Sequence, residues 1–207
     1  MTHLQREIER LKRKVLALGA LVEENLRLAV QAIETRDAVK ARRVIAGDLV
    51  IDENEVEVEE ECLKLLALYQ PVAKDLRFII AVVKINSELE RIGDLAANVG
   101  ERAEQLTAEY PVPVPRTLPV MADRTRDMLE LVLDALVRRD AVAARRVLAA
   151  DDEIDALHRQ LIDELKEEIR ADLDHLDSIV LIFSVARYME RLADHTTNIA
   201  EDVLYMV

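Results

Sequence analysis

The chain contains two copies of one segment, and this repeat limits the folds open to it more than any other feature. Residues 36–48 read RDAVKARRVIAGD and residues 139–151 read RDAVAARRVLAAD, so 10 of 13 positions are identical at an offset of 103. Residues 90–101 (ERIGDLAANVGE) and 190–201 (ERLADHTTNIAE) share 5 of 12 positions at an offset of 100. Each copy is therefore expected to form one structural unit, with three residues fewer between the two blocks in the second.

Apolar residues recur at helical spacing inside each copy. In the first copy they follow one another at steps of three and four from Val82 to Leu106, and the same steps run from Ile182 to Met206 in the second. Stripes of this kind are typical of long helices that pack in a bundle. The 207 residues include only 4 glycines and 5 prolines, too few for the turns of an all-β or doubly wound fold. These patterns predict an all-α protein.

Capping residues and prolines place the helix boundaries and one linker. Asp37 is a residue type that caps helix starts, and Pro71 is tolerated in the first turn of a helix, so we place breaks at these points. The segment 110–115 reads YPVPVP, and its alternating prolines prevent a helix from crossing it. We predict two tandem three-helix bundles with helices of about 30 residues. The predicted parts are residues 1–107 for the first bundle, 108–117 for the proline-rich linker and 118–207 for the second bundle.

The charge and the cysteine content exclude several classes of function. Lys and Arg number 28 against 41 Asp and Glu, a net charge of −13, which argues against nucleic-acid binding because phosphates need basic partners. Cys62 is the only cysteine, which excludes an intrachain disulfide and a cysteine-based zinc site, and we expect it in the core. The longest apolar run, residues 78–83, is far below the roughly 20 residues of a membrane span. Charges also interrupt the N-terminal residues, so we expect no signal peptide and a cytoplasmic location.

Paired carboxylates recur at matching places in the two copies. Like charges four residues apart on a helix repel each other unless a cation lies between them. Acids are frequent enough here for one such pair to arise by chance, but four pairs at equivalent positions are a stronger signal. Oxygen ligands of this kind suit Mg²⁺, Ca²⁺, Mn²⁺ or iron. The alternative is a solvated acidic face neutralised by Arg91 or Arg191. The four candidate metal-binding pairs are Asp48 with Asp52, Glu90 with Asp94, Asp151 with Asp155, and Glu190 with Asp194.

Other kinds of site have little support in the sequence. A ferritin-type di-iron site needs Glu-x-x-His, but the third residues after Glu90 and Glu190 are Gly93 and Ala193. His195 lies on a different helix face from the acidic pairs, and we expect a surface or partly buried histidine there. The sequence contains no glycine-rich phosphate loop and no Ser-His-Asp or Cys-His set. We therefore expect no enzymatic activity and no organic cofactor.

Three longer segments share their pattern with a known family. They are residues 47–77 (GDLVIDENEVEVEEECLKLLALYQPVAKDLR), 88–101 (ELERIGDLAANVGE) and 188–205 (YMERLADHTTNIAEDVLY). With the tandem copies included, the chain resembles the PhoU family of bacterial phosphate-regulation proteins over nearly its whole length. The resemblance implies two three-helix bundles related by a pseudo-twofold axis.

The resemblance also implies a function. Family members are negative regulators of the phosphate regulon that act when phosphate is plentiful. They are thought to connect the ATPase subunit of the phosphate ABC transporter to a sensor histidine kinase, so that the membrane is reached only through partners. Some carry iron or zinc on paired acidic motifs, which map here onto all eight carboxylates named above. A homodimer is also expected.

Two other functions remain open from the sequence. A metal-dependent enzyme could use carboxylate-held ions to activate water, although no general base distinct from the ligands is visible. A plain dimerisation scaffold would use exposed apolar faces of the bundles instead. Deletion of a scaffold would leave phosphate-regulated expression unchanged, whereas deletion of a regulator would not.

Overall fold

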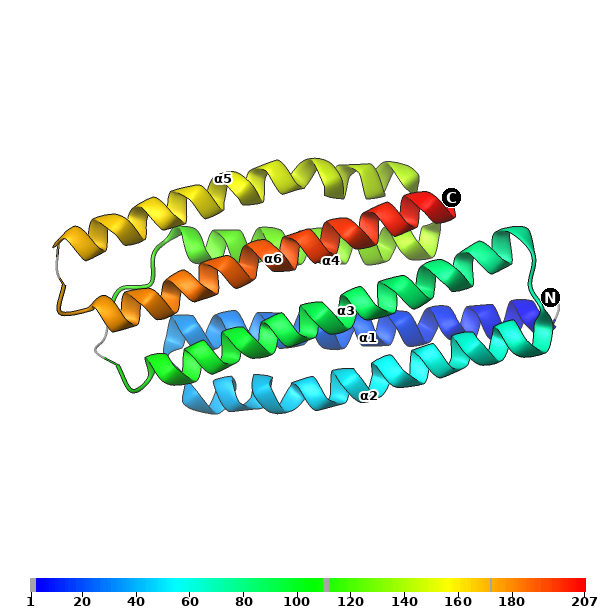
Figure 1. Ribbon diagram of the computed structural model, residues 1–207, viewed down its shortest axis with the longest axis horizontal. Helices are drawn as coiled ribbons and strands as arrows, with labels where there is room; N and C mark the ends of the chain where they lie inside the picture. The colour runs from blue at the N-terminus through cyan, green and yellow to red at the C-terminus, as the bar shows by residue number, and fades with distance from the viewer. Residues whose placement is uncertain (1–2, 110–111, 172) are drawn as a thin grey trace.

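The computed structural model describes residues 3–109, 112–171 and 173–207, and these ranges contain six α-helices and no strand (Figure 1). The first three helices belong to the first copy of the repeat and the last three to the second. Their bounds are α1 His3–Thr35, α2 Ala38–Tyr69, α3 Ala73–Leu106, α4 Thr117–Arg138, α5 Ala141–Ala171 and α6 Leu176–Met206. The predicted all-α fold of two tandem three-helix bundles is confirmed.

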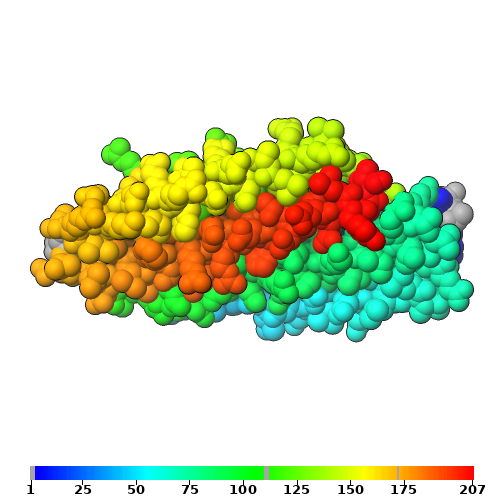
Figure 2. All heavy atoms as spheres, turned by 45° about the horizontal axis from the view of Figure 1, so that its top comes forward, coloured from blue at the N-terminus to red at the C-terminus, as the bar shows by residue number. Residues whose placement is uncertain are grey.

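The two bundles lie side by side along their length. Helices α1, α2 and α3 pack against one another, as do α4, α5 and α6, and the bundles meet through α3 with α6 and through α1 with α4. Figure 1 shows α3 and α6 running in opposite directions, with both chain termini at the same end. In the space-filling view the two copies form one elongated body in which α6 lies along α3 (Figure 2).

The repeated Arg-Asp pair builds the same turn in both copies. Arg36 has a φ of 48° and Arg139 a φ of 54°, so a left-handed residue follows the preceding helix in each case. Asp37 then caps α2 by accepting hydrogen bonds from two backbone N–H groups at 2.9 and 3.1 Å. Asp140 caps α5 in the same way at 2.8 and 3.0 Å. The helix start predicted from Asp37 is confirmed.

The predicted apolar stripes form the core. Every stripe residue from Val82 to Leu106 of α3 and from Ile182 to Met206 of α6 is buried, and one continuous cluster of apolar side chains extends over both bundles. Cys62 is fully buried in this core, as predicted, and burial raises the pKa of its thiol to about 12. No helix in the described residues has an apolar stretch of the length that a membrane span requires.

Helix α4 departs from the predicted length. It has 22 residues, whereas the other five have between 31 and 34, so the prediction of about 30 residues is wrong for this helix. The prolines at positions 111, 113 and 115 delay its start to Thr117, the last residue of the predicted linker. Residues 110–111 of that linker lie outside the described residues.

Candidate metal centre

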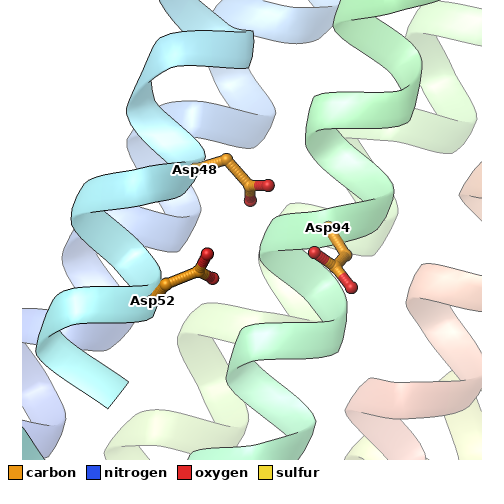
Figure 3. A group of neighbouring side chains, drawn as sticks. All are labelled: Asp48, Asp52 and Asp94. Atoms are coloured by element: carbon orange, nitrogen blue, oxygen red, sulfur yellow. The ribbon is translucent and has the colours of Figure 1, made fainter. Parts of the chain in front are cut away.

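Three of the eight predicted carboxylates meet between α2 and α3. Asp48 and Asp52 lie one turn apart on α2, and Asp94 comes from α3 (Figure 3). Each offers a carboxylate oxygen, and these oxygens all lie within 4.8 Å of one another. Figure 3 shows the side chains of Asp48 and Asp52 pointing from α2 towards α3. We call Asp48, Asp52 and Asp94 the first-copy cluster.

The first-copy cluster concentrates negative charge. None of its three side chains forms an ion pair within the described part of the chain. Burial, followed by the charges of Asp94 and Asp52, raises the pKa of Asp48 to about 6. Burial and the charge of Asp52 also raise the pKa of Asp94. The metal-free cluster is therefore electrostatically unfavourable at neutral pH.

One oxygen of the cluster lacks any partner. Asp48 Oδ1 is fully buried and accepts no hydrogen bond. A buried acceptor without a partner is rare. Burial removes its hydrogen bonds to water, and without a new hydrogen bond that loss of free energy is not compensated. The donor set contains only carboxylate oxygens, which hard and borderline cations prefer. The residues present therefore fit a bound cation.

A glycine allows α3 to approach α2 beside the cluster. A Cβ atom at Gly93 would lie 2.9 Å from Cγ2 of Ile51 and 3.6 Å from Oδ1 of Asp48. The first distance is shorter than real Cβ contacts, so a side chain at Gly93 would force Ile51 or the two helices to shift. Gly100, two turns further along α3, has the same relation to Val44, at 2.9 Å from its Cγ1. Glycine inside a helix is unfavourable by roughly 0.5–1 kcal/mol relative to alanine, and close packing explains its presence here.

The second copy does not bring its carboxylates together in the same way. Within the described residues, Asp151, Asp155 and Asp194 do not form a group with oxygens at this separation. Ala193 stands at the position of Gly93, so the second copy has a methyl group where Ile51 fills the space beside the glycine in the first copy. Asp155 also has a cationic partner, because its Oδ2 lies 3.6 Å from Nη1 of Arg159. The two constellations are therefore not equivalent.

The remaining predicted carboxylates lie near these groups without completing them. Glu90 is outside the first-copy cluster, but burial and the charges of Asp94, Asp52 and Glu55 raise its pKa. The pKa of Asp151 is raised by burial first and then by several neighbouring charges. Those charges belong to Asp194, Asp155, Asp152 and Glu190. All eight carboxylates thus lie in two acidic regions, and the tight group has three members from the first copy.

Sequence reasoning missed a polar contact between the two bundles. His195 of α6, expected as a surface or partly buried histidine, is half-buried, and its Nδ1 lies 2.7 Å from Oε2 of Glu88 on α3. Asn198 donates a hydrogen bond to the same oxygen at 3.0 Å, and Lys84 pairs with Asp202 at 2.9 Å further along. These contacts join positions that are not equivalent in the repeat. Only the antiparallel register of α3 and α6 brings them together, and neither helix's own sequence encodes that register.

Comparison with known proteins gives the same two units. The PhoU domain matches residues 15–103 and again residues 118–203. The phosphate-specific transport system accessory protein PhoU of Edwardsiella tarda is 34% identical over 201 residues, which cover 97% of this chain and 83% of that protein. The corresponding homolog from Aquifex aeolicus is 36% identical over 188 residues, which cover 91% of this chain and 85% of that protein.

Solved structures agree with the sequence relatives. The crystal structure of PhoU from Pseudomonas aeruginosa superposes with a TM-score of 0.91 at 34% identity, covering 99% of this chain and 98% of that one. The phosphate transport system regulatory protein PhoU from Streptococcus pneumoniae gives a TM-score of 0.91 at 28% identity, covering 99% and 96%. Because the domain matches both copies and the likeness extends over almost the whole length, the chain belongs to the PhoU domain family.

Proposed function

We propose that this chain is a regulatory accessory protein of a phosphate transport system and acts as a negative regulator of the phosphate regulon when phosphate is plentiful. The observation that carries the proposal is the match of both copies to the PhoU domain, together with relatives that are named phosphate-specific transport system accessory proteins. The regulator acts by binding to its partner proteins in a complex, and it catalyses no reaction.

The proposed complex has two partners at the cytoplasmic side of the membrane. One is the ATPase subunit of the phosphate ABC transporter, and the other is a sensor histidine kinase. Two bundles joined along α3 and α6 by one continuous core form an elongated body with separate outer faces for two such partners. Contact with the membrane is made through these partners, and the chain forms a homodimer.

The first-copy cluster is proposed to hold a cation. Asp48, Asp52 and Asp94 would be the ligands, and Glu90 adds negative charge nearby. Iron or zinc is the proposed ion, with Mg²⁺, Ca²⁺ or Mn²⁺ as substitutes, because carboxylate oxygens accept all of them. When bound, the ion neutralises three repelling carboxylates and holds α2 against α3. A second, weaker site is proposed on the equivalent carboxylates, which are Asp151, Asp155, Glu190 and Asp194.

The regulatory proposal is tested by the output of alkaline phosphatase in phosphate-rich medium. Deletion of the gene is expected to raise the output, and restoration to silence it. Restoration with a chain that carries Glu90→Lys and Asp94→Lys is expected to silence it less, with the helical content unchanged by circular dichroism. An output that stays low after deletion would overturn the regulatory function. Full silencing by the folded double variant would remove only the metal centre from the mechanism.

A further inference from the structure

Helix α2 exposes an apolar stripe on its outer face. Leu49, Val56 and Leu63 are 64%, 49% and 57% exposed. They are spaced seven residues apart, so they lie along one side of the helix over about 21 Å. Helix α2 packs against α1 and α3 only and lies at the edge of the molecule (Figure 1), so no other helix covers this side. We call these three residues the α2 stripe.

The second copy shows that the α2 stripe is not needed for folding. Five of the seven buried positions of α2 recur as buried positions of α5 at an offset of 103, as Ile51 matches Ile154 and Cys62 matches Leu165. At the same offset, the three positions of the α2 stripe are all charged and exposed in α5. They are Asp152, Arg159 and Lys166. A bundle of this design thus folds with charges at these positions, and the apolar residues of the first copy need another reason.

The charges around the α2 stripe indicate which partner it fits. Residues 48–61 contain eight acidic side chains and no Lys or Arg. Glu53 and Glu60 lie on one side of the stripe and Glu59 on the other, at helical angles of about 40–60° from it. These three form no ion pair within the described residues. A shallow depression around Val56 is also lined by acidic side chains.

A second copy of the chain is a poor match for this face. An antiparallel pair of α2 helices centred on Val56 would place residues 52–53 opposite residues 59–60, and all four are acidic. Like charges held opposite each other across an interface oppose association. A helix with an apolar side flanked by Lys and Arg would satisfy both the stripe and the acids. Such a helix buries its apolar anchors at steps of three, four and seven residues.

We propose that the α2 stripe is a docking site for a basic amphipathic helix of a partner protein. Leu49, Val56 and Leu63 provide the apolar contact, and the neighbouring glutamates select partners that carry Lys and Arg beside the apolar side. Two observations support this site: the equivalent positions of α5 are charged, and the residues around the α2 stripe are acidic. Neither depends on which transport or signalling protein supplies the helix.

The test uses the full chain and a labelled 21-residue helical peptide, with Leu along one side and Lys on both flanks. A second peptide has the same Leu residues and Glu in place of Lys. The matched protein variant is Leu49→Asp with Leu63→Lys, which introduces the residues of the second copy and leaves the net charge unchanged. Val56 is kept, because Arg at this position would reach Asp52 as Arg159 reaches Asp155.

We expect fluorescence anisotropy to show binding of the basic peptide, at least tenfold weaker binding to the double variant, and no binding of the acidic peptide. Glu53→Gln with Glu60→Gln is expected to weaken binding and reduce its dependence on salt. Equal binding of the basic peptide to wild type and the Leu49→Asp, Leu63→Lys variant would overturn the proposal. So would sedimentation that shows a wild-type dimer dissociated by this variant, since a second copy would then occupy the face.

Discussion

The two acidic regions carry the same four-carboxylate pattern, yet their surroundings differ. In the first copy, Gly93 lets α3 lie close to α2, and no Lys or Arg of the described residues forms an ion pair with Asp48, Asp52 or Asp94. In the second copy, Ala193 replaces this glycine and Arg159 pairs with Asp155. Ligand-type residues at the right spacing are therefore only one requirement for a cation site. In this chain the tight group of carboxylates coincides with a glycine on α3 and with valine in place of arginine on the next turn of α2.

Loss of a first-copy carboxylate is the largest expected effect. Asp94→Asn removes one of three charged ligands, and we expect Mn²⁺ to bind on the order of 100-fold more weakly, which corresponds to about 2.7 kcal/mol. The rise in Tm on adding Mn²⁺ should disappear with it. Asp194→Asn is the matched change in the second copy and should leave most of the rise intact. Equal losses from the two variants would mean that the two regions bind cations alike.

A methyl group at position 93 should make the packing of α3 against α2 more like the packing of α6 against α5. Gly93→Ala places a Cβ against Ile51, and overpacking of this kind costs about 1–3 kcal/mol of unfolding free energy. We expect about tenfold weaker Mn²⁺ binding as α3 moves away from α2. Gly100→Ala crowds Val44 in the same way, away from the carboxylates. Denaturant unfolding should show similar losses for both variants, whereas calorimetry should show weaker Mn²⁺ binding for Gly93→Ala alone.

The second region should gain affinity when its extra charge is removed. Arg159→Val introduces the first-copy residue of the same position and frees Asp155 from its ion pair. We expect a several-fold increase in Mn²⁺ affinity at this region, measured in an Asp94→Asn background that silences the first. An exchange in the other direction, Val56→Arg, should weaken the first-copy cluster. Unchanged affinities in both exchanges would show that the arginine has no influence on cation binding.

The smallest expected effect is a change in the pH dependence of stability. The folded chain raises the pKa of Asp48 to about 6, so this carboxyl holds its proton more tightly when folded than when unfolded. The free energy of unfolding of the metal-free chain should therefore fall as pH rises from about 4 to about 6. At pH 7, Asp48→Asn should raise the Tm of the metal-free chain by about 2–4 °C.

Asp151→Asn is the control for this pH effect. The pKa of Asp151 is also raised by burial and by its neighbours, so the direction is the same. The gain in Tm should be smaller than that of Asp48→Asn, because Asp155 beside it is partly neutralised by Arg159. A Tm profile from pH 4 to pH 8 for wild type and both variants checks the prediction, and a wild type as stable at pH 7 as Asp48→Asn would contradict it.

Most of the fold could be predicted from the sequence because its signals are local. The apolar steps of three and four residues mark the buried faces, and Asp37 marks the start of α2 through its own hydrogen bonds. Proline alternation predicts the break between the bundles. The sequence does not predict the shorter α4. The repeat suggests helices of equal length, but the prolines before Thr117 prevent the first part of this helix from forming.

The candidate site could be predicted only in part. The four-residue spacing correctly places Asp48 and Asp52 on one face, but their meeting with Asp94 depends on how closely two helices approach. The role of Gly93 in packing depends on the position of Ile51 on the neighbouring helix, which no local pattern in the sequence reveals. The contact of His195 with Glu88 depends on the register between bundles, which no periodic pattern within one helix encodes.

The central claim is that the first copy, and not the second, builds a tight cation site from this shared pattern. Calorimetric titration of the metal-free chain with Mn²⁺ at pH 7 tests it most directly. We expect one tight site per chain, which is lost in Asp48→Asn and retained in Asp151→Asn. Two sites of equal affinity, or a titration that Asp48→Asn leaves unchanged, would contradict the claim.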